Sequence, residues 1–204
     1  ALLSWGFDAA THQYILEFVL GNTLILNGDY TKEGLKEILE NVNVLITLPT
    51  MADYMLQQYD SEVFNNIRYV TFGGEKIEES TYAMLKKKAK NVKVILNNYG
   101  PTEATVCVGI KDLTLHYSKE LQEVENVKCE VFDKNRKRLP YGAHGELYIK
   151  GANLTNGYLD EAETSKNFVW VDGELYYKTG DRAYGLTQNS YVICGRISDS
   201  DYIK

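Results

Sequence analysis

The segment Asn97–Glu103, with the sequence NNYGPTE, gathers residue types that could form part of a nucleotide site. Tyr99 offers a flat aromatic face, and a Gly-Pro pair interrupts the chain where a ligand could approach the backbone. Thr102 supplies a hydroxyl and Glu103 a carboxylate, a hard oxygen ligand that Mg²⁺ accepts together with phosphate. This set suits a purine, a phosphate and a magnesium ion. Taken alone, the segment fits equally well a turn that begins a helix.

The first half of the chain alternates short apolar runs with helical patterns. Apolar runs bounded by turn residues predict buried strands at residues 23–26, 42–48, 67–72 and 92–96. Apolar residues at helical spacing predict helices around residues 35–42 and 82–89, and Pro49 suits the first turn of a third helix. This alternation implies crossover connections, and it therefore predicts a doubly wound α/β fold with a mostly parallel sheet.

In such a sheet, ligands gather where the strands end at their carboxyl sides. The segments Phe72–Glu75 (FGGE) and Asn97–Glu103 each follow a predicted strand. We therefore expect two glycine-containing loops at the same edge of the sheet.

The second half has a different sequence pattern, in which short runs typical of strands are separated by Gly, Asp and Asn. The runs VKCEVFD, GELYIKG, ELYYKTGD and SYVICGR predict antiparallel strands in a smaller β-rich part, a distorted barrel or a sandwich. We place the boundary near residues 109–118. The predicted domains are residues 1–109, an α/β subdomain, and residues 110–204, a β-rich subdomain.

Composition and charge narrow the classes of function. The 204 residues are 44% hydrophobic and carry a formal net charge of −6, which argues against nucleic-acid binding. No apolar run is long enough for a membrane span, and the first residues resemble neither a signal peptide nor a methionine start. The three cysteines have no metal-type spacing. We expect a cytoplasmic location and a chain that begins inside a longer polypeptide.

Further motifs accompany NNYGPTE in a fixed order along nearly the whole chain. They are FDAATHQYI at residues 7–15, FGGE at 72–75, GELYIKGANLTNGYL at 145–159, YKTGD at 177–181 and GR at 195–196. With these motifs the sequence resembles the adenylate-forming superfamily, in particular the amino-acid adenylation domains of nonribosomal peptide synthetases.

The resemblance implies a nucleotide site with one role per position. Tyr99 would stack on adenine, and the base edge would meet Gly73, Gly74, Glu75 and Asn97. The catalytic residues would be Thr102, which donates to the α-phosphate, and Glu103, which helps to hold Mg²⁺. Asp181 would accept the ribose hydroxyls, and Arg196 would reach the ribose and phosphate side.

The resemblance also implies an amino-acid pocket. Asp8 would pair with the α-ammonium of the substrate, because a carboxylate buried beside a ligand needs a cation. The other lining residues would be Ala9, His12, Thr47, Val70, Phe72, Asn98, Val106 and Cys107. These side chains are mostly neutral and suit a neutral amino acid, aromatic or aliphatic.

The implied reaction uses ATP and Mg²⁺ to form an aminoacyl-AMP, which is then transferred to the phosphopantetheine arm of a carrier protein. The implied partners are a peptidyl carrier protein and neighbouring synthetase domains. The sequence departs from the family in two ways. It has no Gly- and Ser/Thr-rich phosphate loop ending in lysine. It also lacks the catalytic lysine of the lid, since it ends at Lys204 in the expected hinge segment, where Asp199 is the expected hinge residue. We expect the isolated chain to be a truncated core with little or no catalytic activity.

Three alternatives stay open at this point. D-alanine:carrier-protein ligases share the aspartate in the first motif and the YGPTEAT segment. Other acyl-AMP or acyl-CoA ligases share the chemistry but do not require Asp8. A non-catalytic nucleotide-binding or interaction module would also accommodate the missing lysine regions.

Overall fold

The computed structural model describes residues 2, 6–26 and 28–197. The predicted hinge residue Asp199 lies outside them. The chain divides into two compact units. Unit 1 comprises the described residues up to 99 together with 112–118, and unit 2 comprises 100–111 together with the described residues from 119. The assignment of functions to residues 1–109 and 110–204 stays a prediction.

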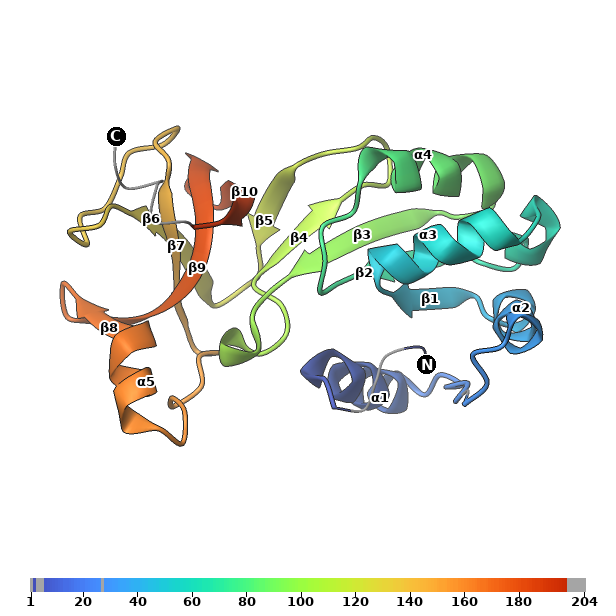
Figure 1. Ribbon diagram of the computed structural model, residues 1–204, viewed down its shortest axis with the longest axis horizontal. Coiled ribbons are helices and arrows are strands. Elements are labelled where there is room, and N and C mark those ends of the chain that lie inside the picture. Colours follow the sequence, from blue (N-terminus) through green and yellow to red (C-terminus); the bar gives the residue numbers. More distant parts are fainter. Residues whose placement is uncertain (1, 3–5, 27, 198–204) are drawn as a thin grey trace. The chain divides into compact units, whose positions relative to one another are not determined.

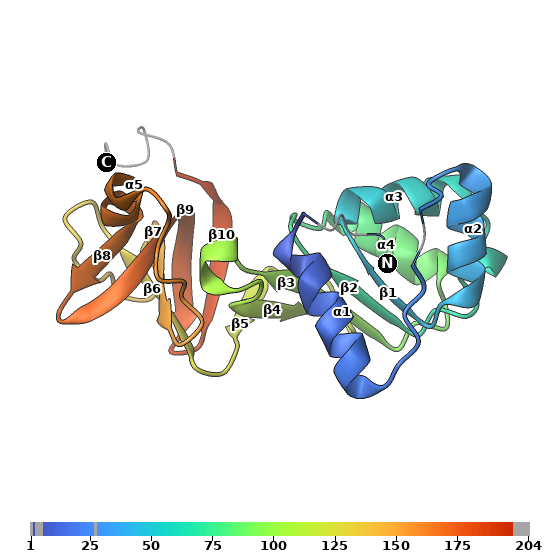
Figure 2. The same ribbon diagram turned by 90° about the horizontal axis from the view of Figure 1, so that it is seen from below.

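Unit 1 is a three-stranded parallel sheet with helices on both faces. Its elements are α1 (Asp8–Leu20), α2 (Lys32–Asn41), β1 (Val44–Thr47), α3 (Pro49–Gln58), the short 3-10 helix η1 (Ser61–Phe64), β2 (Tyr69–Phe72), α4 (Glu79–Lys88) and β3 (Val94–Tyr99). Strand β2 pairs in parallel with β1 and β3. Helices α3 and α4 lie over one face of the sheet (Figure 1), and α1 crosses the other face (Figure 2). The doubly wound arrangement predicted for this part is therefore confirmed.

Local chemistry explains where these helices begin. The Thr31 hydroxyl accepts a hydrogen bond from the Gly34 backbone N–H at 3.2 Å, which caps α2. Pro49 occupies the first turn of α3, where its missing N–H costs nothing. The apolar side chains of these helices, with those of α4 and the sheet, form one core that includes Leu35, Met55 and Leu85.

The prediction of a strand at residues 23–26 is wrong. The structure has irregular backbone there, and Leu26 is 61% exposed. An apolar run becomes a strand only where a neighbouring strand accepts its backbone hydrogen bonds, and a sequence pattern does not contain that information. The other three strands predicted in this half occur, each beginning two residues later than expected.

Unit 2 is an antiparallel sheet. Its elements are η2 (Thr102–Ala104), β4 (Gly109–Asp112), β5 (Glu120–Glu123), β6 (Val127–Phe132), β7 (Gly145–Gly151), α5 (Glu161–Asn167), β8 (Phe168–Val171), β9 (Glu174–Thr187) and β10 (Ser190–Arg196). The strand order is β4-β5-β10-β9-β7-β6, and β8 pairs with β9. The predicted fold class, an α/β part followed by a β-rich part, is confirmed, but the described strands of unit 2 form an open sheet and not a closed barrel.

An aromatic cluster supports the centre of unit 2. Phe132, Tyr148, Val169 and Tyr176 are buried together. The ring of Phe132 lies 4.6 Å from that of Tyr148 and 5.3 Å from that of Tyr176, measured between centroids. These residues come from β6, β7, β8 and β9, so the cluster joins strands that are distant in sequence.

No helix within the described ranges is long and apolar enough to cross a bilayer.

Candidate nucleotide and substrate site

In unit 1, the predicted ligand loops lie at the carboxyl ends of the parallel strands. Thr47, Phe72 and Asn97 form one row across β1, β2 and β3. The Asn97 side-chain amide donates to the Glu75 backbone oxygen at 3.4 Å, which joins the end of β3 to the loop after β2. In that loop Gly74 has φ +76°, a conformation that favours glycine. The structure thus brings together the residues predicted for the base edge.

Asp8 carries the most informative polar group of unit 1. It is the first residue of α1, and its Oδ1 accepts a hydrogen bond from the Ala9 backbone N–H at 2.7 Å. Its Oδ2 is buried and has no hydrogen-bond partner among the described residues. The Oδ1 of Asn98 is also buried and has no hydrogen-bond partner in the described part of the chain. Buried acceptors normally have a donor, so each marks a position where a ligand donor would be stabilising.

The remaining predicted pocket residues of unit 1 differ in exposure. Thr47, Val70 and Phe72 are all almost fully buried, and the last two belong to the hydrophobic core. Ala9 is half-buried, and His12 is exposed on α1. The pocket roles of these five residues stay predictions.

In unit 2, the loop that follows Tyr99 is strained and held by a second segment. Thr105 and Val106 have φ values of 51° and 69°, which are costly for β-branched residues. The Asn153 side-chain amide donates to the Ala104 backbone oxygen at 2.6 Å, and the Thr105 hydroxyl donates to the Asn153 backbone oxygen at 2.7 Å. These two bonds compensate the strain and hold the loop. Cys107, at its end, is half-buried and donates from Sγ to the Gly109 oxygen at 3.6 Å.

We expect Asn153→Ala to lower the free energy of unfolding by about 1–3 kcal/mol, because the fully buried Ala104 residue would lose the donor to its carbonyl. Urea unfolding measures the change. The matched control is Asn156→Ala in the same segment, where the side chain is exposed and a change within about 0.5 kcal/mol is expected. Equal effects of the two substitutions would contradict a clamp at Asn153.

Glu103 is held by side chain and backbone. The Tyr158 hydroxyl donates to its Oε1, and the Thr155 backbone N–H donates to its backbone oxygen at 2.8 Å. Tyr177, on β9, lies within hydrogen-bonding reach of the same pair. Burial raises the pKa of Tyr177, and its hydrogen bond with Tyr158 raises it further, so this phenol stays protonated.

The donor set at Glu103 fits a magnesium ion that a nucleotide also holds. Thr102 is exposed beside the half-buried Glu103 carboxylate. Over the described ranges, no group of three or more His, Cys, Asp or Glu side chains could hold a metal without further ligands. Magnesium is usually bound by one or two carboxylates together with substrate phosphates, so a single carboxylate suits a metal that arrives with a nucleotide.

The predicted ribose residues lie side by side in unit 2. Asp181 on β9 and Arg196 on β10 are paired in register, and Arg196 Nη1 donates to Asp181 Oδ1 at 3.1 Å. The same guanidinium donates to the Thr179 backbone oxygen at 2.8 Å. Gly180, which lies between Thr179 and Asp181 in the chain, has φ +69°, and its N–H donates to the Glu146 carboxylate at 3.1 Å. The two strands thus place a carboxylate, which can accept from sugar hydroxyls, beside a guanidinium, which can donate to a phosphate.

Sequence reasoning assigned no role to several residues that hold these side chains. Asn153, Tyr158, Tyr177 and Glu146 all lie inside the motifs that were recognised, but they act through contacts between distant segments. The one available signal was their position within the motifs. Spacing alone could not show that Tyr158 reaches Glu103, because the two are separated by 55 residues.

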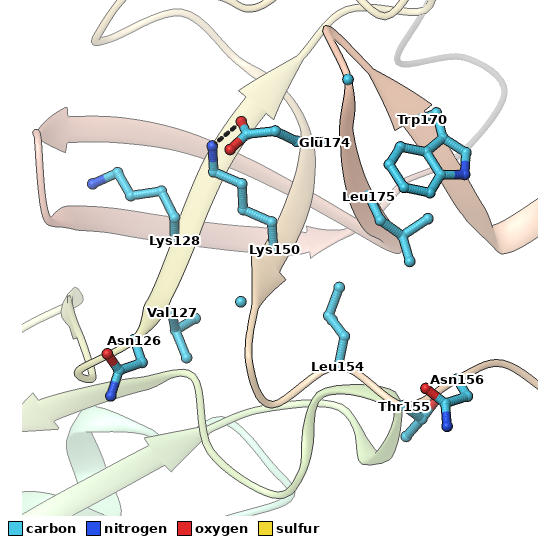
Figure 3. A pocket seen from close by; sticks show the side chains of 12 residues that line it. Asn126, Val127, Lys128, Lys150, Leu154, Thr155, Asn156, Trp170, Glu174 and Leu175 are labelled. Atoms are coloured by element: carbon cyan, nitrogen blue, oxygen red, sulfur yellow. Dashed lines mark hydrogen bonds and ion pairs between the residues drawn. The ribbon is translucent and has the colours of Figure 1, made fainter.

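Unit 2 also has an open groove whose lining includes none of the predicted site residues, although Thr155, which is hydrogen-bonded to Glu103, is part of it. Its volume is about 680 Å³, and its lining includes Lys128, Lys150, Leu154, Trp170 and Leu175. Figure 3 shows the Lys150 ammonium directed at the carboxylate of Glu174, with which it forms an ion pair. Lys128 is likewise paired with Glu123. The two cations are therefore already neutralised within the protein.

Comparison with solved structures defines the class of fold. An artificially fused adenylation-PCP di-domain, NpsA-ThdA from Klebsiella oxytoca, matches with a TM-score of 0.78 at 21% identity. The match covers 96% of this chain and 42% of the other. The fold is therefore that of an adenylation domain, and it carries the predicted loops at the strand ends.

Comparison of sequences gives the family. The family model described as AMP-binding enzyme matches residues 1–159, and the chain belongs to this family. The dapdiamide synthesis protein DdaD of Enterobacter agglomerans is 30% identical over 205 residues, which cover 96% of this chain and 34% of that protein. Gramicidin S synthase 2 of Aneurinibacillus migulanus is 30% identical over 209 residues, which cover 97% of this chain and 5% of the synthase. The chain thus spans about a third or less of these two relatives.

Proposed function

We propose that this chain is the part of an amino-acid adenylation domain that selects the amino acid and holds the adenosine of the adenylate. The observation that carries the proposal is the buried Oδ2 of Asp8, which has no partner among the described residues. A buried anionic oxygen is costly unless a cation meets it, and the α-ammonium of an amino acid would supply that cation. A fatty or aryl acid would not.

The proposed reaction joins an amino acid to AMP. A carboxylate oxygen of the amino acid attacks the α-phosphorus of ATP, the bond from that phosphorus to the bridging oxygen breaks, and pyrophosphate leaves. Thr102 would donate to the α-phosphate, and Glu103 would hold the magnesium ion, which neutralises developing charge on the phosphates. Tyr99, with Gly73, Gly74, Glu75 and Asn97, would bind adenine. Asp181 and Arg196 would bind the ribose side.

The proposed product is then consumed by a carrier protein. The thiol of a phosphopantetheine arm would attack the acyl carbon, and AMP would leave. Support comes from a relative named as a nonribosomal peptide synthetase, in Aspergillus fumigatus, and from the adenylation-PCP di-domain among the structural neighbours. A neutral substrate is favoured because the other proposed pocket residues carry no carboxylate or lysine.

The test is calorimetric titration of the chain with non-hydrolysable aminoacyl-AMP analogues of Phe, Tyr, Leu, Val and D-Ala. AMP and an acyl-AMP analogue without the amino group serve as reference ligands. Binding is the informative measurement, since no Gly- and Ser/Thr-rich loop ending in lysine occurs among the 204 residues. We expect one aminoacyl analogue to bind more tightly than both references.

The variant Asp8→Asn should lower the affinity for that analogue by about 10- to 100-fold, the value of one charge-assisted hydrogen bond, without changing the affinity for AMP. Asp60→Asn is the control, because Asp60 is an exposed carboxylate in the same unit. An amino-free analogue that bound as tightly as every aminoacyl analogue would contradict the proposed substrate class.

A further inference from the structure

The segment from Asn153 to Tyr158 holds Glu103 from two directions. Its Thr155 N–H fixes the backbone of Glu103, and its Tyr158 hydroxyl fixes one oxygen of the carboxylate. A carboxylate offers about four lone-pair positions, so one hydroxyl donor orients it and leaves acceptor capacity for a cation. Hydrogen bonds of this kind to the ligands of a metal determine their orientation and basicity.

Tyr158 is itself anchored to helix α5. Its backbone N–H donates to the Thr164 hydroxyl at 2.8 Å, and the Thr164 hydroxyl donates to the Tyr158 backbone oxygen at 3.3 Å. Asp160 caps α5 by accepting from two backbone N–H groups, at 2.8 and 3.2 Å. The ring of Tyr158 also packs against Phe168, at 5.8 Å between centroids. The hydroxyl is therefore presented from a fixed position, although 39% of the residue is exposed.

The close packing at Gly157 shows that this position is specified. A Cβ at Gly157 would lie 2.5 Å from the Thr164 methyl carbon, and its φ is +115°. Only glycine allows the chain to turn so tightly against α5 immediately before Tyr158. The same hydroxyl neighbours Tyr177 on β9, the strand that carries Asp181.

We propose that Tyr158 is a positioning residue that orients the Glu103 carboxylate for a divalent cation bound together with nucleotide phosphates. The proposal rests on the proposed function, which gives Glu103 its metal. Helix α5 fixes the position of Tyr158, and the Tyr158 hydroxyl in turn fixes the orientation of the Glu103 carboxylate before the cation binds. The energy that would otherwise be needed to order the Glu103 side chain on binding is thereby saved.

The test uses electron paramagnetic resonance of Mn²⁺ with the chain and a non-hydrolysable ATP analogue. Tyr158→Phe keeps the ring that packs on Phe168 and removes only the hydroxyl. We expect it to weaken Mn²⁺ binding in the presence of the analogue by about 10-fold or more. The affinity for the analogue without metal should not change. Tyr141→Phe is the matched control, since Tyr141 is 64% exposed in the same unit and should behave as the unmodified chain.

Glu103→Gln separates this proposal from the proposed function. If Glu103→Gln loses the metal while Tyr158→Phe binds it normally, the positioning role is overturned and the function of Glu103 stands. If Tyr158→Phe weakens the metal-free affinity as much as the metal affinity, Tyr158 only supports the fold and the proposal is wrong. If the unmodified chain and Glu103→Gln bind Mn²⁺ equally, Glu103 holds no metal, and both the metal role and this proposal fail. The aminoacyl-AMP titration still judges the substrate class in that case.

Discussion

Replacing Gly100 with alanine is expected to force the loop between Tyr99 and Cys107 out of its present conformation. A Cβ at this position would lie 2.4 Å from the backbone oxygen of Val106 and 2.7 Å from the backbone nitrogen of Cys107. These are backbone atoms, so no side-chain rotation relieves the contact. The loop already carries two residues with positive φ, and it has little freedom to move without losing the bonds to Asn153.

We expect Gly100→Ala to cost about 2–3 kcal/mol in the free energy of unfolding, as overpacking against an immovable neighbour does. It should also abolish the Mn²⁺ binding that depends on the ATP analogue, because the loop carries Thr102 and Glu103. Urea unfolding and paramagnetic resonance measure the two effects.

Gly28→Ala is the control for Gly100→Ala. An added Cβ at Gly28 meets nothing within 4 Å, and φ there is not positive. Its stability should stay within about 0.5 kcal/mol of the unmodified chain. A Gly100→Ala variant that matched this control in stability and metal binding would show that the loop is adaptable and that the tight contact has no importance.

Replacing Phe132 with alanine is expected to produce the largest loss of stability. Phe132 is 1% exposed, and its ring contacts those of Tyr148 and Tyr176. Removing a buried phenylalanine costs about 3–5 kcal/mol, because transfer free energy is lost and a cavity remains. The loss should extend to binding, since Tyr148 and Tyr176 lie on the strands β7 and β9 that carry Glu146 and Asp181.

Thermal or urea unfolding of Phe132→Ala, compared with Trp170→Ala, tests this expectation. Trp170 is a larger aromatic residue, but it is 68% exposed on β8. Its removal should cost little, although more aromatic surface is deleted. Comparable losses in the two variants would mean that the Phe132 cluster is not the principal core of unit 2.

The sequence by itself indicated the family and located part of the elements, although it did not predict α1, α5 or β8. Apolar runs and helical spacing located β1, β2, β3, α2 and α4, and glycine, proline and acidic residues marked the loops between them. These features are local: a period of two or of 3.6 residues, or a cap, depends only on neighbours along the chain. For the same reason the motifs could be recognised and given expected roles before any fold was known.

Local pattern failed where the outcome depends on a distant partner. Residues 23–26 have the apolar composition of a strand, but they form none in the structure. The tertiary structure alone decided that Asn153 clamps the strained loop, that Tyr158 reaches Glu103 across 55 residues, and that Arg196 meets Asp181. Such contacts depend on how segments far apart in sequence pack together, and no periodicity along the chain encodes them.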